Sequence, residues 1–185
     1  MAIEEAKYDV IQKDGPFEIR EYAPHILAET VVGGELAKAG NKAFRRLFQY
    51  ITGNNHSNDK VAMTAPVSQQ PSGESIKMTA PVGQQGSDGH WAVSFMMPAS
   101  YTIDSLPVPA DSNVSLRQVP AQTIAAVRYS GFWSQTNYSN YKAKLESWMK
   151  ERGLHSAGEP IWARYNSPFM PWFWRRNEIL IPFQS

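Results

Sequence analysis

The two halves of the chain carry the same pattern, and this repeat constrains the fold more than any other feature of the sequence. The segment EIREYAPHILAETVVGG (Glu18–Gly34) aligns with SLRQVPAQTIAAVRYSG (Ser115–Gly131), so that Arg20 stands 97 positions before Arg117. Each copy contains two short strand-like pieces, separated by a break of alanine and proline, and each ends at glycine. Such a repeat indicates a fold built from two similar units.

A segment with helical periodicity follows each copy. After the first copy, ELAKAGNKAFRRLFQYITG places its apolar side chains along one helical face and ends at Gly53. After the second copy, SQTNYSNYKAKLESWMKERG does the same, with Ser134 as the expected N-cap and Gly153 at the end. Both segments are therefore predicted to be helices that bury one face.

Strand-like segments follow each predicted helix. They are KVAMTAPVSQQ and SIKMTAPVGQQ in the first half, with HWAVSFMMP as an additional strand, and EPIWARYNSP and NEILIPF in the second half. Each half is too small to bury both its helix and its sheet face alone, so we expect one sheet built from both halves. We predict a single α+β domain over residues 1–185, a distorted antiparallel β-barrel of two pseudo-symmetric βαββ repeats with two outer helices. The half-repeats span roughly residues 8–97 and 114–185.

Composition excludes several classes of function. The chain has no cysteine, which rules out disulfides, zinc-thiolate sites and thiolate nucleophiles. Its net charge of +1 gives no electrostatic reason to expect a nucleic-acid partner. The sequence lacks a glycine-rich phosphate loop, an H-E-x-x-H motif and a nucleophile elbow. We therefore favour a non-enzymatic role and leave enzymatic activity open.

The N-terminal sequence bears on the compartment. The start MAIEEAKYDV has no basic segment followed by an apolar one, which predicts a cytoplasmic protein. The first predicted strand follows almost at once, and a periplasmic location is expected if a leader has been removed before Met1. The sequence leaves the compartment between these two and the oligomeric state open.

One motif occurs twice. MTAPV stands at Met63–Val67 and again at Met78–Val82, and QQ follows each copy. The intervening SQQPSGES, with Pro71 and Gly73, predicts the turn of a hairpin. In a structural interpretation the small residues let another element approach closely. In a functional one the thioethers of the two methionines line an apolar ligand pocket.

An ordered set of motifs resembles a known family. EIREY, a helix, KVAMTAPV and a late YNSP and RRNE occur in this order and together resemble the SOUL/haem-binding protein family over nearly the whole chain. The doubled MTAPV resembles bacterial members. The resemblance implies a distorted β-barrel of two βαββ repeats, akin to the gyrase-inhibitor-like effector-binding domains. It also implies reversible binding of haem or a related tetrapyrrole, as a carrier, buffer or sensor.

The resemblance also implies where a tetrapyrrole would bind, namely on the first helix and on the loop before the last strand. By position these residues are Asn41, Phe44, Arg45, Phe48 and Gln49 on the helix, and Phe169, Met170, Pro171, Trp172, Phe173, Trp174 and Arg175 on the loop. Some relatives carry arginine at the position of Asn41 and lysine at that of Gln49, and both charges are missing here. The remaining candidates to pair with propionates are Arg45, Arg46, Arg175 and Arg176. The alternative for Phe44 and Phe48 is that they pack the helix on the sheet.

The axial ligand is less clearly indicated. One branch of the family has a histidine within the motif that reads EIREY, where this chain has Glu21. His25, four residues later, is the candidate axial ligand for haem iron. The remaining histidines are expected to be solvated loop residues. His56 and His90 lie in polar loop sequence, and His155 follows the second predicted helix. Haem held without a strong protein ligand is the alternative.

Two other functions remain open. Related folds place a glutamate in an apolar cleft, and Glu178 is the candidate here for binding a cationic amphiphile or for acting as a base in a hydrolytic domain. Desolvation would raise the pKa of such a carboxyl, whereas an ion pair with Arg164, Arg175 or Arg176 is the structural alternative. The segment PWFWRR also has the composition of an interaction module, in particular of a weak membrane-surface contact.

Overall fold

The structure is a computed structural model that describes residues 4–57, 76, 79–87, 89–166 and 169–184. The first MTAPV motif, Met78 of the second motif and the predicted turn at Pro71 and Gly73 lie outside these ranges. The predictions made for the two methionines are therefore not addressed by the structure.

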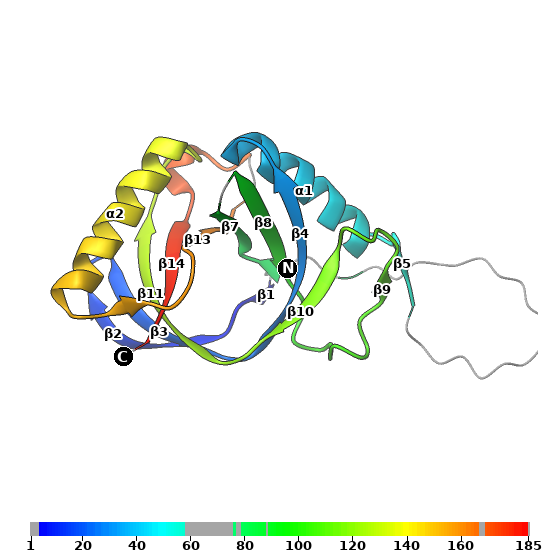
Figure 1. The fold of residues 1–185 in the computed structure, drawn as a ribbon, viewed down its shortest axis with the longest axis horizontal. Coiled ribbons are helices and arrows are strands. Elements are labelled where there is room, and N and C mark those ends of the chain that lie inside the picture. The colour runs from blue at the N-terminus through cyan, green and yellow to red at the C-terminus, as the bar shows by residue number, and fades with distance from the viewer. Residues whose placement is uncertain (1–3, 58–75, 77–78, 88, 167–168, 185) are drawn as a thin grey trace, which may run out of the picture.

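One large antiparallel sheet curls into a half-barrel, and both helices lie on its outside (Figure 1). The helices are α1 (Leu36–Ile51) and α2 (Gln135–Glu151). The strands of the sheet are β2 (Tyr8–Asp14), β3 (Phe17–Tyr22), β4 (His25–Gly33), β7 (Val82–Ser87), β8 (His90–Met96), β10 (Ser115–Val119), β11 (Gln122–Tyr129), β13 (Ile161–Arg164) and β14 (Asn177–Gln184), with β12 (His155–Ser156) beside β14. Their spatial order is β10-β4-β8-β7-β13-β14-β11-β3-β2. The predicted α+β fold, a distorted antiparallel barrel with two outer helices, is confirmed, and its sheet is a half-barrel.

Four very short strands lie outside this sheet. β1 (Glu4–Glu5) pairs in parallel with β6 (Thr79–Ala80), and β5 (Asn55–His56) pairs with β9 (Val108–Pro109). A single-turn 3-10 helix, η1 (Trp172–Trp174), precedes β14. Within the described residues, neither α1 nor α2 is long and apolar enough to cross a membrane.

The two halves exchange their first strands. β3 of the first half pairs with β11 of the second, and β10 of the second half pairs with β4 of the first. The two strand pairs have equivalent registers: Arg20 faces Ile124, and Arg117 faces Leu27, the residue that the repeat aligns with Ile124. The centre of the sheet is the pair β7 and β13, one strand from each half. Neither half therefore has a complete sheet of its own.

The structure corrects the assignment of strands in the first half. The strand that corresponds to β14 is β8, which the sequence analysis treated as an addition, because β8 pairs with β4 as β14 pairs with β11. The strand that corresponds to β13 is β7, which begins only at Val82. The segment equivalent to the aromatic loop before β14 is thus the two-residue connection between β7 and β8, and not SQQPSGES. The MTAPV repeat was misleading because it has no counterpart in the second half.

Each helix covers its own part of the core, as the 3.6-residue periodicity of both predicted. Ala39, Ala43 and Leu47 of α1 pack over β4 and β8. Leu145, Trp148 and Met149 of α2 pack over β11 and β14. Ser134 caps α2 as expected, since its hydroxyl accepts a hydrogen bond from the amide of Asn137 at 3.1 Å. The opposite, concave face of the sheet carries a third cluster: Tyr22, Ile124, Ala126, Ala163 and Leu180.

Candidate functional site

Four exposed aromatic rings form a continuous surface, which we call the aromatic cluster (Phe132, Trp172, Phe173 and Trp174). Phe132 and Trp172 stack with ring centroids 5.1 Å apart, Trp172 and Phe173 meet edge to face at 5.4 Å, and Phe173 and Trp174 meet at 5.2 Å. Trp174 is 69% exposed and the neighbouring Phe169 is 95% exposed. A soluble domain gains nothing in stability from rings left in water, so this surface indicates a contact with something else.

The loop that carries the aromatic cluster is fixed to the segment before α2. The amide of Gly131 donates to the carbonyl oxygen of Trp172 at 3.1 Å. Arg175 donates from Nε to the carbonyl oxygen of Met170 at 2.8 Å, and its guanidinium lies 4.6 Å from the ring centroid of Trp133. Trp133 in turn donates to the side-chain oxygen of Asn177 at 2.7 Å. The rings are therefore exposed on a loop whose backbone is tied to the fold.

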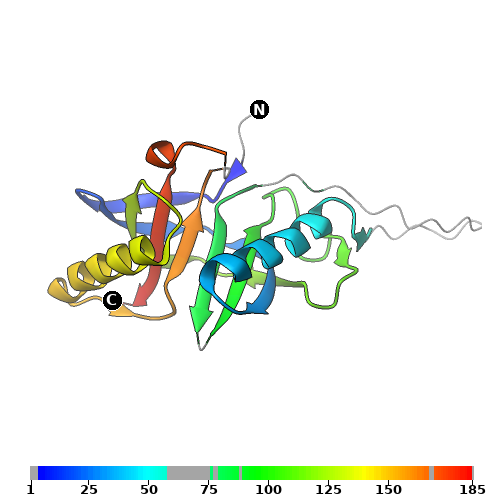
Figure 2. The same cartoon turned by 90° about the horizontal axis from the view of Figure 1, so that it is seen from above.

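The predicted helix face is a separate surface. Asn41, Arg45, Phe48 and Gln49 are exposed on α1, while Phe44 is half-buried. Phe44 stacks on Phe48 at 6.0 Å and meets Phe95 edge to face at 5.2 Å, so it packs the helix on the sheet as the structural alternative proposed. Figure 2 shows η1 well apart from α1. The structure thus brings the loop residues together with Phe132 and Trp133 and leaves the helix residues elsewhere.

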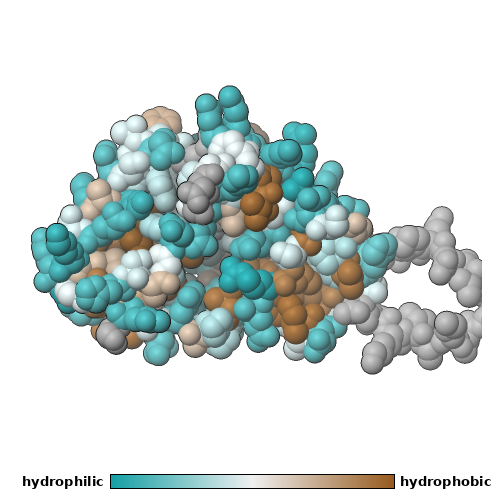
Figure 3. Space-filling model, viewed as in Figure 1, coloured by the Kyte–Doolittle hydropathy of each residue, from teal (hydrophilic) through white to brown (hydrophobic). Residues whose placement is uncertain are grey.

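His25 lies at a third place, beside a cavity of about 270 Å³. The cavity is lined by the turn before β4, by the segment after β8 and by β1, and Figure 3 shows apolar surface gathered over β10 and the segment after β8 on this side of the molecule. Nδ1 of His25 lies 2.9 Å from the carbonyl oxygen of Ala23, which can only accept, so Nδ1 carries the proton. Nε2 is then the nitrogen with a free lone pair in the neutral ring. The cavity is small beside the usual size of a pocket for a drug-sized ligand.

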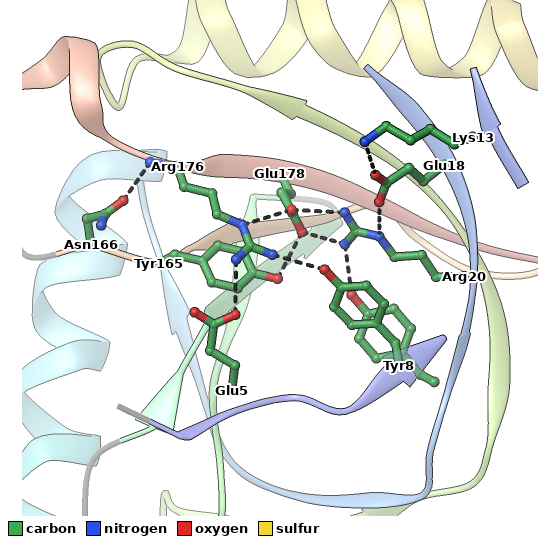
Figure 4. A network of polar contacts seen from close by, with 10 residues as sticks. Glu5, Tyr8, Lys13, Glu18, Arg20, Tyr165, Asn166, Arg176 and Glu178 are labelled. Carbon is green, nitrogen blue, oxygen red and sulfur yellow. Dashed lines mark hydrogen bonds and ion pairs between the residues drawn. The ribbon is translucent and has the colours of Figure 1, made fainter. Parts of the chain in front are cut away.

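Glu178 lies on the concave face, fully buried in a network of polar side chains (Figure 4). Arg20 donates to both of its carboxylate oxygens, at 2.6 and 3.0 Å, and the hydroxyl of Tyr165 donates at 2.8 Å. Arg176 donates from Nε at 3.0 Å. Arg176 also reaches Glu5 at 3.0 Å, which connects the network to the exposed strand β1. An ion pair with Arg176 was one of the expected alternatives, whereas the pair with Arg20 was missed.

The electrostatics of this network differ from the expectation for a general base. Burial by itself would raise the pKa of Glu178, but the hydrogen bonds and charge of Arg20, with Arg176 and Tyr165, hold that pKa below its ordinary value. The predicted upward shift is therefore wrong. Burial of the side chain and, next, the negative charge of Glu178 raise the pKa of Tyr165. Glu178 is ionised, and its two oxygens are already occupied by donors.

The sequence analysis missed Phe132 and Trp133. A signal was present, because two large aromatic residues stand between Gly131, which ends the repeat, and the N-cap of α2. Gly131 has a φ of +140°, which favours glycine and turns the chain sharply so that both rings leave the sheet. Their contact with a loop 40 residues later could not be inferred from local pattern.

The fold and the surface define a class of protein: a pseudo-twofold α+β half-barrel of the gyrase-inhibitor-like type. Solved structures with this fold include the EcmrR C-terminal domain, with a TM-score of 0.62 and 12% identity over 96% of this chain and 98% of that one. A hydrolase from Listeria innocua has a TM-score of 0.58 and 12% identity, with 94% of each chain covered. At these identities the likeness concerns the fold alone.

Sequence comparison identifies the family. The model of the SOUL heme-binding protein family matches residues 3–182, and the chain belongs to this family. Heme-binding protein 2 of Mus musculus is 26% identical over 178 residues, which cover 94% of this chain and 81% of the mouse protein. Heme-binding protein 2 of Homo sapiens is 28% identical with the same coverage. The resemblance found in the motifs is confirmed.

Proposed function

We propose that this protein reversibly binds haem or a related tetrapyrrole on the aromatic cluster, as a carrier, buffer or sensor. The observation that carries the proposal is the set of exposed, mutually contacting rings on a loop tied to the fold. A tetrapyrrole is a flat apolar ring, and such rings stack favourably on Trp and Phe faces. Membership of the haem-binding family supports the choice of ligand.

The residues at the aromatic cluster are better suited to contact the flat faces of a tetrapyrrole than to coordinate its iron. Phe132, Trp172 and Trp174 provide apolar area, and Arg175 beside them provides a cation for a propionate. His25, the candidate axial ligand, lies instead at the small cavity near β1. Haem would supply its own iron chemistry when bound. The part of the chain that the structure describes supports a ligand held by its faces and its acidic groups.

An absorbance titration with ferric haem, ferrous haem and metal-free protoporphyrin tests this proposal. We expect similar affinities for all three, because the protein contacts the ring rather than the iron. Trp174→Ala should weaken binding at least about fivefold, since a well-placed aromatic contact contributes about 1 kcal/mol. Ile11→Ala, which truncates an exposed apolar side chain on β2, is the matched control and should leave the affinity unchanged. Absence of any spectral change at micromolar protein would exclude the proposal.

Two further variants locate the site. Phe48→Ala alters the exposed ring on α1, and His25→Ala removes the candidate axial ligand. If the aromatic cluster is the site, neither change affects protoporphyrin binding. A loss of ferric haem affinity on His25→Ala, with protoporphyrin unaffected, would move the site to the cavity beside β1.

A weak membrane contact is the second candidate function. The exposed rings of the aromatic cluster with Arg175 have the composition that favours the interface of a bilayer, where Trp lies at the headgroup level. Sedimentation with liposomes, with and without anionic lipid, tests this candidate. Trp174→Ala should reduce the bound fraction if the cluster inserts, and equal sedimentation of both proteins would reject this role.

A further inference from the structure

Three buried polar atoms lack a hydrogen-bond partner among the residues that the structure describes. They are Nε of Arg164, Nε1 of Trp162 and the hydroxyl of Tyr129. Trp162 is 1% exposed and Tyr129 is 5% exposed, so water does not reach these two side chains freely. Buried donors without a partner are rare in native proteins, so three of them in one place require an explanation.

These three groups lie together on the helix-facing side of the sheet centre. Trp162 and Arg164 are two residues apart on β13 and therefore share a face. Burial raises the pKa of Tyr129, whereas a weak hydrogen bond with the Trp162 indole and the charge of Arg164 lower it. Both groups therefore lie close to the hydroxyl, although neither makes a hydrogen bond of ordinary geometry with it. The other side of the Arg164 guanidinium is held by Gln84, whose amide oxygen accepts from Nη2 at 3.2 Å.

Arg164 is a cation without a counter-charge among the residues that the structure describes. Within the described ranges no carboxylate forms an ion pair with it, whereas Arg20 and Arg176 both pair with Glu178. Burial lowers the pKa of Arg164 to about 10, which still leaves the side chain charged near neutral pH. A buried charge is costly unless it is paired, so this position is suited to an anion from outside the chain.

The N-terminal parts of both helices lie close to Arg164. A Cβ at Gly40, in the second turn of α1, would lie 3.3 Å from Nη2 of Arg164. On the other side, the guanidinium lies 5.3 Å from the ring of Trp133, which immediately precedes the N-cap of α2. Figure 1 shows the N-terminal ends of α1 and α2 facing each other across the middle of the molecule. Neither first turn contains an acidic residue, so the positive ends of both helix dipoles add to the charge of Arg164.

One acidic residue stands at the start of α1, and its carboxylate pairs with a neighbouring lysine. Glu35, at the N-cap of α1, makes no capping hydrogen bond, is largely exposed and pairs with Lys38 at 3.3 Å. The position therefore combines a guanidinium, two further donors and two helix starts, and none of these groups is neutralised by a described carboxylate.

We infer that Arg164 binds a carboxylate of a ring-bearing ligand, with the Trp162 indole and the Tyr129 hydroxyl as additional donors. This inference rests on the proposed function, since it supplies the acid-binding part of the same ligand site. Trp133 connects the two parts, because the guanidinium of Arg175 also lies over its ring, beside the aromatic cluster. The rings of the ligand would lie on the cluster while its carboxylate reaches Arg164.

Two-dimensional NMR of the indole N–H groups tests the inference, because the chain has only 6 tryptophans. The probes are 1-naphthoate and its neutral counterpart 1-naphthalenemethanol. We expect naphthoate to shift the Trp162 signal, and Arg164→Gln to weaken naphthoate binding at least about tenfold. Arg117→Gln removes an exposed arginine and should have no effect. Equal binding of naphthoate to Arg164→Gln and to the unaltered protein would overturn the inference, as would an equal shift with the alcohol.

A second variant distinguishes a loss of binding from a loss of folding. Tyr129→Phe removes only a hydroxyl that lacks a hydrogen bond, so the protein should remain folded with unchanged or higher stability. It should still weaken naphthoate binding, by about threefold or more. Unchanged binding would remove Tyr129 from the site. The outcome is separable from the proposed function, because naphthoate binding without tetrapyrrole binding would retain the anion site and reject the tetrapyrrole.

Discussion

Arg20 and Arg117 occupy equivalent positions in the two halves but have opposite surroundings. The Arg20 side chain is 2% exposed and lies 2.6 Å from Glu178, whereas that of Arg117 is 50% exposed and lies 3.1 Å from Glu29. Their backbones make the same reciprocal strand pairs. The repeat therefore determines where the two arginines stand on the sheet, and their neighbours determine whether they are buried.

The cause of this difference lies on the strands that follow the helices. Glu178 faces Arg128 in the sheet, and the equivalent pair in the first half is Ala92 with Val31. The first half thus has no carboxylate at the position of Glu178. The concave face of the second half is also covered by Tyr8 and by the N-terminal segment, which reaches the network through Glu5. One inner face is sealed by a charged network, and the other remains partly open.

The halves also differ in the connection between their last two strands. β7 and β8 are joined by two residues, 88–89, whereas β13 and β14 are joined by residues 165–176, which carry most of the aromatic cluster. The long loop begins and ends at the charged network, because Tyr165 and Arg176 belong to both. The two halves therefore differ in the length and in the aromatic content of this connection.

The largest expected effect comes from removing the buried arginine. Arg20→Met should lower the free energy of unfolding by about 3–5 kcal/mol, because it leaves part of a buried ion pair unmatched. Arg117→Met should cost less than about 1 kcal/mol, as expected for an exposed pair. Urea denaturation of both variants measures the difference. Equal losses would mean that the two positions are not energetically distinct.

The second largest effect is expected at low pH, where protonation of Glu178 should weaken the charged network. The folded pKa of Glu178 is below its ordinary value of 4.5, so its stabilising contribution is complete above the unfolded pKa. That contribution is lost as the pH falls from about 4.5 through the lower folded pKa. Unfolding measured between pH 7 and pH 3 should show a steep acid loss in the unaltered protein and a shallower one in Glu178→Gln. Glu29→Gln is the control, and parallel profiles for all three proteins would refute this role of Glu178.

The cap residues of the two helices are expected to contribute differently to stability, by a moderate amount. Ser134 caps α2 with its hydroxyl, whereas Glu35 makes no side-chain cap at α1. Ser134→Ala should therefore lower stability by about 1 kcal/mol, and Glu35→Ala should change it by less than about 0.5 kcal/mol. Thermal unfolding of the two variants tests this contrast. A loss on Glu35→Ala as large as that on Ser134→Ala would contradict it.

The smallest effect on stability is expected in the aromatic cluster. Trp174→Ala should change the free energy of unfolding by less than about 0.5 kcal/mol, because the ring is mostly exposed. The same substitution is expected to weaken ligand binding, so stability and function separate at this residue. A loss of stability above about 2 kcal/mol would show instead that the ring belongs to the core.

Much of the fold could be predicted from local patterns. The helices, the cap at Ser134 and the two-unit sheet all follow from periodicity and from the spacing between Arg20 and Arg117. The assignment of β7 and β8 failed because a repeated five-residue motif was given more weight than the pairing partners of a strand. Of the predicted site residues, the structure gathers those of the loop into one surface and leaves the α1 residues and His25 in other places, and the binding role of all of them stays a prediction.

The two-unit plan, the amphipathic helices, the family and the aromatic loop before the last strand can all be recognised from local patterns in the sequence. Which charges meet depends on how distant segments pack. Arg20 and Glu178 are 158 residues apart and are joined because the halves exchange their first strands. Among the described residues Arg164 has no carboxylate partner, because its neighbours are Gln84, Trp133 and Trp162, which come from three separate segments. Local periodicity depends on residues a few positions apart, whereas the burial and pairing of a charge depend on every segment that packs around it.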